Sequence, residues 1–274
     1  MKRPDLSVIL VSHNDASYLR ACLDSLAPER HAVTFEVFLV DNVSTDETVQ
    51  LVRAGYPWVH LLENTHRQGF AANNNRAIRA STGSYVLLLN PDTQVLPEAL
   101  ERLVGYMDAE PRVGLCGPQL TYPDGRIQLS CRRFPTLGSV LVRRTALRVW
   151  LRDSAVDRRH LMADTDHGSR REVDWLLGAC LAARRELLRT VGLLDPGYYL
   201  YVEDIDWAYR AWQHGWRVGY CPEARVVHHH QASSDKALFS RHSLHHVRSM
   251  WRYYRKHLAP SWLRLHVQPD LLAD

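Results

Sequence analysis

The stretch Leu6-Ser7-Val8-Ile9-Leu10-Val11 is rich in β-branched and aliphatic residues, as expected of a buried strand. From residue 16 to residue 26 the apolar residues instead recur at helical spacing. A strand followed at once by a helix is the repeating unit of α/β folds. The start of the chain therefore predicts that strands and helices alternate.

The same order continues over the next eighty residues. We predict strands at residues 35–40, 59–62 and 85–89, and helices at residues 45–54, 70–80 and 97–107. Repeated β-α units give parallel strands joined by right-handed crossovers. The expected fold class is α/β, a doubly wound, mostly parallel sheet flanked by helices.

The pattern weakens after residue 121. Residues 151–172 are polar, and we predict a mobile loop there. Order returns at residues 173–181, which predict a strand pair or a bend around Gly178, followed by a short helix at residues 185–191.

Length and composition restrict the class of protein. A chain of 274 residues with 46% hydrophobic residues can bury the core of one large domain or two small ones. It lacks the run of about 20 apolar residues that spans a bilayer, and its first residues lack the layout of a signal peptide. The five cysteines form no C-x-x-C pair, which favours reduced thiols over structural zinc. We therefore predict a cytoplasmic protein.

The formal net charge of +4 is unevenly distributed. Residues 236–266 hold seven Lys or Arg and no Asp or Glu, interleaved with the aromatic residues Phe239, Trp251, Tyr253, Tyr254 and Trp262. Such a helix can lie on an anionic lipid surface, or it can pack on the domain with a solvated basic face. Both interpretations remain open. Nucleic-acid binding is disfavoured, because the excess charge is small and confined to one end.

Polar residues follow three of the predicted strands. Ser12-His13-Asn14 follows the first strand, Asp41-Asn42 the second, and Asn90-Pro91-Asp92 the fourth. Ligands of doubly wound sheets bind beyond the carboxyl ends of the strands. One Asx residue after a strand can simply make a turn. Three such segments at equivalent strand ends predict a binding site.

A second acidic element is Tyr201-Val202-Glu203-Asp204-Ile205-Asp206-Trp207. Together with Asp92 it suggests one carboxylate that holds a metal and one base that faces a nucleotide-activated substrate. The alternative is that these acids are favoured by the dipole at a helix N-terminus. We prefer this alternative for Asp206, which is also spaced to pair with Arg210 on the helix face.

Six motifs in order resemble those of the family 2 glycosyltransferases. They are Val40-Asp41-Asn42-x-Ser44-x-Asp46, Gly69-Phe70-Ala71-x-x-Asn74-Asn75, Leu89-Asn90-Pro91-Asp92, Gly178-Ala179-Cys180 with Arg184-Arg185, Tyr201-x-Glu203-Asp204-x-Asp206, and Val227-His228-His229. The subgroup they are most similar to is the rhamnosyltransferase type of bacterial polysaccharide assembly. The resemblance implies a GT-A-like fold.

The resemblance also implies roles for individual residues. It assigns nucleotide contacts to Ser12, His13, Asn14, Asp41, Asn42, Ser44, Gly69, Asn74 and Asn90. It assigns donor or acceptor contacts to Trp175, Gly178 and Ala179, the metal to Asp92 and His228, and catalysis to Asp204 with Glu203 beside it. Like-charge repulsion between these two acids would raise a pKa, which suits a base.

Several of these assignments keep an alternative. Trp175 can stack on a sugar or belong to the core, and Asn74 can serve the start of a helix. His228 is one of 15 histidines. Two positions depart from the family pattern, because Asn90 replaces the first acid of the Asp-x-Asp motif and His13 stands where an aromatic such as Tyr is usual. Arg67 is a further candidate for a phosphate contact.

The implied activity is that of an inverting glycosyltransferase that depends on Mg²⁺ or Mn²⁺. It would move a sugar, by subgroup rhamnose, from a nucleoside diphosphate to a hydroxyl of a glycan or lipid-linked acceptor. A UDP-hexose or UDP-galactofuranose donor is the alternative within this class, and a non-catalytic nucleotide-sugar-binding protein the alternative outside it. The first strand-helix turn lacks Gly-x-Gly-x-x-Gly, which argues against a dinucleotide oxidoreductase.

We expect a catalytic domain at residues 1–230, divided at residue 120 into a nucleotide-binding and an acceptor-binding half. Residues 231–274 form a basic, aromatic helical extension in this division. Peripheral contact of the extension with the inner face of the cell membrane, and self-association into a homo-oligomer, are further expectations.

Overall fold

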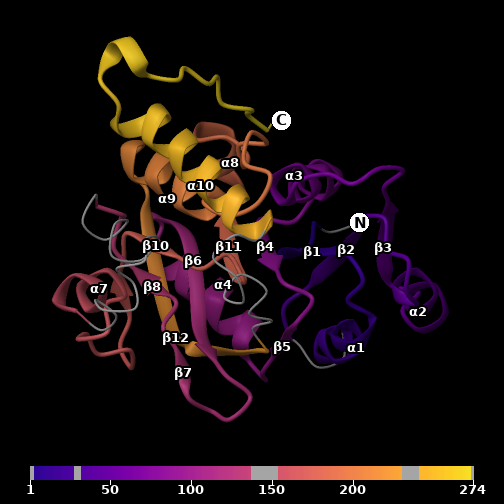
Figure 1. Ribbon diagram of the computed structural model, residues 1–274. Helices are drawn as coiled ribbons and strands as arrows, with labels where there is room; N and C mark the ends of the chain where they lie inside the picture. Colours follow the sequence, from indigo (N-terminus) through magenta and orange to yellow (C-terminus); the bar gives the residue numbers. More distant parts are fainter. Residues whose placement is uncertain (1–2, 28–31, 137–153, 230–240, 273–274) are drawn as a thin grey trace.

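A computed structural model describes residues 3–27, 32–136, 154–229 and 241–272 (Figure 1). One sheet runs through these residues in the order β3-β2-β1-β4-β11-β6-β12-β5. Its first half consists of the parallel strands β1 (Leu6–Ser12), β2 (Phe35–Asp41), β3 (Val59–Glu63) and β4 (Tyr85–Leu89). This is the doubly wound arrangement that the alternation of strands and helices predicts.

The second half of the sheet mixes directions. β11 (Cys180–Arg184) runs antiparallel to both β4 and β6 (Val113–Thr121), while β12 (Arg217–His228) runs parallel to β6. β5 (Thr93–Val95) pairs antiparallel with the end of β12. An irregularity between Cys221 and Arg225 breaks the pairing of β12 with β6. Beyond it, β12 returns to the segment that follows β4, so that two chain regions far apart in sequence meet.

Short strands complete the second half. β7 (Ile127–Gln128) pairs with β6, and β9 (Arg171–Glu172) pairs with β12. β8 (Cys131–Arg132) and β10 (Trp175–Leu176) form a separate two-stranded sheet.

Helices cover both faces of the large sheet (Figure 1). One core lies under α1 (Ala16–Ser25), α2 (Thr48–Gly55) and α4 (Ala99–Ala109). The other lies under α3 (Phe70–Ala80), α8 (Arg185–Thr190), α9 (Glu203–Gln213) and α10 (Arg241–Tyr253). Within β1, Val8 and Leu10 belong to the first core and Ile9 to the second. Both faces of the strand are buried, which explains its continuous apolar sequence.

The expected fold class is confirmed. The strands and helices predicted in the first 110 residues differ from the observed ones by at most three residues at either end. The predicted bend at Gly178 lies between β10 and β11, and the helix predicted at residues 185–191 is α8. β6 and β12 were not predicted, because Gly114, Gly117 and Pro118 in β6 and Gly219 and Pro222 in β12 weaken the strand signal.

The prediction of a loop at residues 151–172 is wrong in part. Its described residues include α7 (Ala155–His160), whose N-cap Ser154 accepts a hydrogen bond from the Asp157 amide, and β9. The polar composition of this segment gave no apolar helical period, so the short helix capped by Ser154 was not predicted.

The C-terminal extension packs on the second helical layer. After α10 the chain forms the π-helix η2 (Tyr254–Leu258) and the 3₁₀-helix η3 (Ser261–Leu263). It then returns to α8, where the amides of Leu193 and Leu272 donate to the carbonyls of Asp270 and Leu188. No helix in the described ranges is long and apolar enough to cross a membrane.

Gly83 provides a test of how tightly β1 and β4 are joined. A Cβ at Gly83 would lie 2.6 Å from the Ser7 amide nitrogen and 2.7 Å from the Leu6 carbonyl carbon. Since backbone must move to relieve these contacts, we expect Gly83→Ala to destabilise the protein by about 1–3 kcal/mol in urea unfolding.

Gly105→Ala is the matched control. Gly105 lies in α4 and a Cβ there meets nothing within 4 Å. The Gly105→Ala variant should be more stable than the wild type by about 0.5–1 kcal/mol, because glycine is unfavourable inside a helix. Equal midpoints for the two variants would contradict the tight contact at Gly83.

Candidate active site

The segment Gly178-Ala179 joins the two acidic elements that the sequence singles out. The Asn90 amide, at the end of β4, donates to the Ala179 carbonyl over 2.9 Å. The Gly178 amide donates to Asp204 Oδ2 over 3.1 Å. The end of β4 and the start of α9 therefore lie on either side of one short segment. Over a hundred residues of chain separate them in sequence.

Asp92 and His228 lie side by side. His228 Nε2 is 3.4 Å from Asp92 Oδ1, and both side chains are largely buried. The strand pairing explains this proximity, because β12 places His228 opposite Thr93 in β5. The His229 amide also donates to the Asp92 carbonyl over 2.9 Å.

Gln128 orients the His228 imidazole. Its Oε1 lies 2.8 Å from His228 Nδ1 and can accept a proton from it; in the neutral imidazole this tautomer leaves the lone pair of Nε2 facing Asp92. Two acceptors 3.4 Å apart are the arrangement that a shared cation resolves. A second contact that fixes the tautomer of a ligating histidine is usual in metal sites. The donor set therefore fits a divalent cation.

The described residues contain no group of three or more His, Cys, Asp or Glu side chains placed to hold a metal. Asp92 and His228 would thus supply two ligands. A cation such as Mg²⁺ commonly completes its shell with water and substrate phosphate oxygens. Such a site would be assembled together with a diphosphate.

Glu203 and Asp204 begin α9 after an unusual turn. Tyr201 and Val202 both have positive φ, 68° and 74°, and a β-branched residue is rarely found in this region. Val202 is buried at 2% exposure, so the surrounding packing holds the turn. Backbone strain of this kind clusters at functional sites.

The two acids differ in their surroundings. Burial raises the pKa of Glu203, and the neighbouring Asp204 carboxylate raises it further. Burial also raises the pKa of Asp204, but hydrogen bonds from the Ile205 and Gly178 amides and the charge of Arg132 oppose the rise. As the pH rises, Asp204 therefore loses its proton before Glu203 does. Glu203 Oε2 is buried with no hydrogen-bond partner among the described residues.

Asp206 is structural, as the sequence favoured. Its buried carboxylate is 2.8 Å from Arg210 Nε, 2.8 Å from Lys256 Nζ and 2.7 Å from His257 Nε2. Burial alone would raise the pKa of Asp206, but these three groups together hold it well below its usual range. The expected pair with Arg210 on the helix face is confirmed.

The extension packs along the turn that precedes the two acids. Three contacts join α10 to this turn: Tyr199 stacks on His245 with ring centroids 4.8 Å apart, Ser249 Oγ donates to the Leu200 carbonyl over 3.0 Å, and Tyr201 lies 5.5 Å from the His246 ring. Asp195 accepts hydrogen bonds from Arg252 and Lys256. The position of Asp204 thus depends on the docked extension.

Asp41 has the geometry of a ligand acceptor. It is buried at the end of β2, beside Ser12 in β1, and its Oδ2 accepts the Ser44 amide over 3.1 Å. Its Oδ1 is also buried and has no partner among the described residues. Because an unsatisfied buried acceptor is costly, a donor on a ligand would stabilise it.

Other residues of the predicted nucleotide site hold loops together. Asn42 Oδ1 accepts the Gln68 amide, and its Nδ2 donates to the Gln68 carbonyl. The backbone amide of Asn14 (φ 61°) donates to the Ser44 hydroxyl. His13 Nδ1 lies 3.0 Å from the Asn42 carbonyl oxygen. Ser12 Oγ donates to Asp15. These bonds fix the loops around Asp41.

Gly69 and Asn74 have packing roles. A Cβ at Gly69 would lie 2.8 Å from the Tyr199 Cα, and the Phe70 amide donates to the Tyr199 carbonyl. Asn74 Nδ2 donates to the Phe70 carbonyl one turn earlier in the same helix, and no described side chain caps the start of α3, so the capping alternative for Asn74 is not supported. The absence of a side chain at Gly69 thus lets the backbone at Tyr199 pack against the start of α3.

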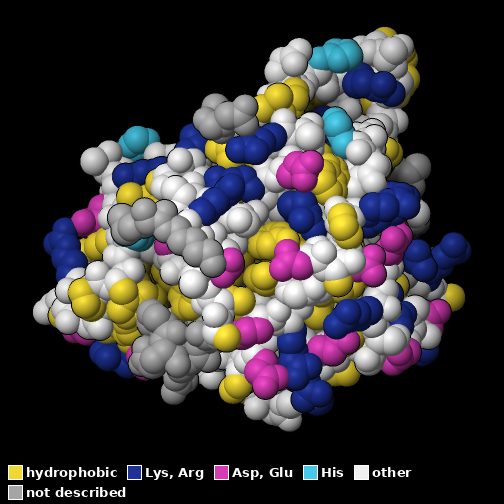
Figure 2. Space-filling view, turned by 180° about the vertical axis from the view of Figure 1, so that it is seen from behind, with side chains coloured by type: hydrophobic (Ala, Val, Ile, Leu, Met, Phe, Trp, Pro, Cys, Tyr) yellow, Lys and Arg dark blue, Asp and Glu magenta, His cyan; other side chains and the backbone are white. Residues whose placement is uncertain are grey.

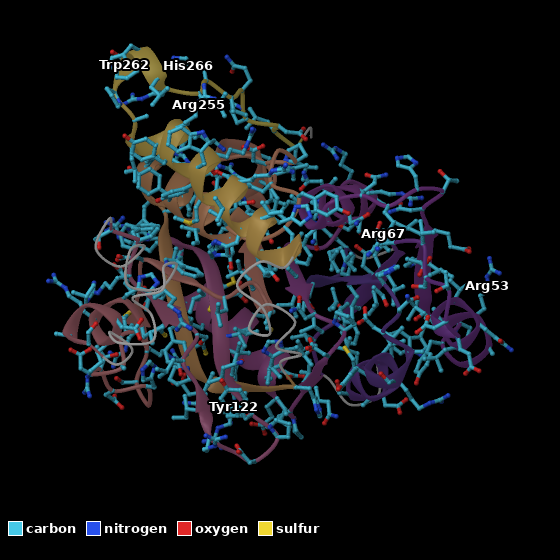
Figure 3. The ribbon with its side chains drawn as sticks, viewed as in Figure 1. Arg53, Arg67, Tyr122, Arg255, Trp262 and His266 are labelled. Carbon is cyan, nitrogen blue, oxygen red and sulfur yellow. The ribbon has the colours of Figure 1, made fainter. Side chains whose placement is uncertain are left out.

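Trp175 belongs to the core. It is 6% exposed, and its indole N–H donates to the Arg133 carbonyl over 2.9 Å. This favours the core alternative over sugar stacking. Arg67 is exposed on the β3–α3 connection (Figure 3).

Two residues beside the site were missed by sequence reasoning. Gln128 contacts His228, and buried Arg132 acts on Asp204. Both lie in the short strands β7 and β8, after the turn at Pro123-Asp124-Gly125. Nothing in the local pattern of these strands marks them as part of a site.

Two family profiles match the chain. The profile described as "Glycosyl transferase family 2" matches residues 7–161, and "Glycosyl transferase family group 2" matches residues 85–259. Among curated proteins, N-acetylglucosaminyl-diphospho-decaprenol L-rhamnosyltransferase of Mycobacterium tuberculosis is 33% identical over 258 residues, covering 88% of this chain and 81% of that protein. Rhamnosyltransferase WbbL of Escherichia coli is 26% identical, covering 90% and 91%.

Solved structures show the same fold. GalNAc-T7 with UDP, GalNAc and Mn²⁺ superposes with a TM-score of 0.63 at 18% identity, covering 92% of this chain, which spans 48% of that protein. The mannosyltransferase PcManGT of Pyrobaculum calidifontis, with GDP-Man and Mn²⁺, gives a TM-score of 0.62 at 23% identity, covering 95% and 67%.

Asp206→Asn tests the buried ion cluster. A depressed pKa in the folded state contributes stability above the unfolded value of about 3.9, which is lost as the pH falls below it. The variant should lose about 3–5 kcal/mol of unfolding free energy at neutral pH, because Arg210, Lys256 and His257 lose their shared carboxylate. Its unfolding free energy should also decrease less steeply than that of the wild type as the pH is lowered.

The measurement is urea unfolding between neutral pH and pH about 3. Asp164→Asn, on the exposed turn after α7, is the control and should follow the wild type. An acid dependence in Asp206→Asn as steep as in the wild type would show that the cluster does not control acid stability.

Proposed function

This chain belongs to glycosyl transferase family 2, and on that premise we propose that it transfers rhamnose from a nucleoside diphosphate donor to a hydroxyl of a lipid-linked glycan. It is a glycosyltransferase, and two of its relatives bear the name of rhamnosyltransferases, one of them for a diphospho-decaprenol-linked acceptor. The observation that carries the proposal is that Gly178-Ala179 bonds both Asp204 and Asn90, and Asn90 begins the segment in which Asp92 contacts His228.

Asp41 binds the nucleobase in this proposal. Its unpaired buried Oδ1 would accept the imide N–H of a uracil or thymine ring. The bonded loops of Ser12, His13, Asn14, Asn42 and Ser44 shape the pocket. In this proposal Asn90 contacts the ribose or a metal-bound water.

Asp92 and His228 would hold the divalent cation, and Gln128 would keep His228 in the ligating tautomer. A bound cation would act as a Lewis acid on the diphosphate leaving group. The solved structures of GalNAc-T7 and PcManGT contain Mn²⁺, which supports a cation in this fold.

Asp204 is the base. Its carboxylate takes the proton of the acceptor hydroxyl as that oxygen attacks the anomeric carbon, and the bond from this carbon to the diphosphate breaks. The bonding pair leaves with the nucleoside diphosphate. A single displacement inverts the configuration. Glu203, still protonated, adds no second charge beside the base.

A lipid-linked acceptor places the enzyme at the inner face of the cell membrane, and peripheral contact there is part of the proposal. Self-association stays a prediction. The alternative donors are UDP-hexose and UDP-galactofuranose. The non-catalytic alternative predicts tight nucleotide binding without turnover in a donor-hydrolysis assay with Mg²⁺ or Mn²⁺.

Asp204→Asn and Glu203→Gln distinguish the two acids. We expect Asp204→Asn to lower kcat by about 10²–10⁴ in nucleotide-release assays over a panel of nucleotide sugars. Glu203→Gln should retain most activity, because Gln resembles a protonated Glu. Since the base must be ionised, kcat/KM should rise with pH, with its acid limb above the ordinary aspartate range because the pKa of Asp204 is raised.

Nucleotide binding by calorimetry serves as the control for folding in both variants. Transfer by Asp204→Asn at the wild-type rate would refute the base assignment. Loss of activity confined to Glu203→Gln would exchange the two roles.

Gln128→Leu tests the metal site without removing a ligand. Loss of the hydrogen bond between Gln128 and the ligating His228 should weaken Mn²⁺ binding by about 10–100-fold. Asp92→Asn and His228→Ala should weaken it further, because each removes a ligand. Mn²⁺ binding in the presence of nucleoside diphosphate, measured by electron paramagnetic resonance, gives a readout besides activity. Chelation should abolish transfer.

The matched control is Gln94→Leu, because Gln94 contacts the neighbouring His229. It should bind Mn²⁺ as the wild type does. Equal Mn²⁺ affinity in Gln128→Leu and wild type would contradict the orienting role of Gln128, and transfer in full chelation would contradict the metal dependence.

A further inference from the structure

The cations of the C-terminal extension divide into two groups. Arg252, Lys256 and His257 point inward and bond the buried acids Asp195 and Asp206. Arg248 and Arg264 are exposed, and Arg255 is half-buried with Nε on the Leu263 carbonyl. Lys236 and Phe239 lie outside the described residues, as does the side chain of Arg241.

The outer face of the extension is apolar. Five side chains form what we call the α10 stripe: Leu244 (57% exposed), Val247 (60%), Trp251 (53%), Leu258 (49%) and Trp262 (81%). Spacings of three and four residues place the first three on one side of α10. The stripe holds five of the nine exposed large apolar side chains in the described part of the chain. A concentration of this kind marks an interaction surface.

Positive charge borders the α10 stripe. Residues 236–269 contain no Asp or Glu, so the outer cations have no acid within the extension. Figure 3 places Trp262, Arg255 and His266 together at the outermost end, opposite Tyr122. In Figure 2 this projecting end shows Lys or Arg, His and hydrophobic side chains and no Asp or Glu.

The α10 stripe begins next to the candidate base. Leu244 precedes His245 and His246, whose rings contact Tyr199 and Tyr201 in the turn before Asp204. One helix therefore has the catalytic turn on its inner face and the apolar stripe on its outer face.

We propose that the α10 stripe docks this protein on an anionic lipid bilayer. The aromatic and aliphatic side chains would enter the interface while Arg248, Arg255 and Arg264 meet the lipid phosphates. A second copy of the chain fits less well, because a two-fold contact would bring two basic surfaces together. The inference deepens the proposed function, on which it rests only for the lipid-linked acceptor.

The test is sedimentation of the full chain with vesicles of phosphatidylcholine alone or mixed with phosphatidylglycerol. Wild type should bind the mixed vesicles, and salt should release it. The double variant Arg248→Glu/Arg264→Glu should bind at least about tenfold more weakly, given about 1 kcal/mol per interfacial cation. Trp251→Ser/Trp262→Ser should also bind at least about tenfold more weakly, because it removes two exposed aromatic side chains that would enter the interface.

Ile127→Ser and Arg53→Glu are the matched controls. Ile127 is 44% exposed in the hairpin next to Tyr122, and Arg53 is exposed on α2, far from the extension in Figure 3. Both should bind as wild type. Undiminished binding by the two double variants, or an equal loss in the controls, would overturn the proposal. So would a dimer in sedimentation velocity that Trp251→Ser/Trp262→Ser dissociates while vesicle binding is retained.

Transfer to a soluble acceptor separates this inference from the proposed function. The Trp251→Ser/Trp262→Ser variant should keep wild-type turnover on such an acceptor, since neither side chain lies in the site. Vesicle binding through the stripe without turnover by any variant would remove the function and leave the docking surface.

Discussion

The structure around the candidate base depends on one buried carboxylate. Asp206 is fully buried, and a buried charge is tolerated only when it is paired. One of its partners, Arg210, comes from the same helix, while Lys256 and His257 come from the extension. The docked extension therefore helps to stabilise the charge in the helix that carries the candidate base. Residues 241–258 thus pack as one unit with α9.

Surroundings give three acids in one helical turn different protonation. Asp206 is charged because cations surround it, and Asp204 is held between burial, which opposes its charge, and two amides and Arg132, which favour it. Glu203 has no counter-charge of this kind, and the charge of Asp204 keeps it protonated longer. The division of labour thus follows from what each carboxyl faces. Sequence spacing alone would make all three equivalent.

The sequence predicts local features better than long-range ones. Apolar runs and the polar residues that follow them located β1, β2 and β4, with Asp41 at the end of β2 and Asp92 after β4, because these signals lie within a few residues. β12 was missed because Gly219 and Pro222 weaken its strand signal and because its pairing partners are distant in sequence. Beyond an irregularity near Cys221, β12 pairs with β5 and places His228 opposite Thr93. Gln128 is part of the site for the same reason, since only the folded sheet brings it to His228.

The extension shows why composition leaves function open. A count of seven cations suits both a membrane contact and a packed helix, since a count does not say which way each side chain points. The structure satisfies the packed interpretation on the inner face, where Arg252 and Lys256 are bound to acids. The apolar side chains are left on the outer face. Both faces belong to one helix. That helix contacts the turn at Tyr201 on its inner face and, in the proposal, would contact a bilayer on its outer face. The orientation of the base and the approach of a membrane-borne acceptor would then be fixed together.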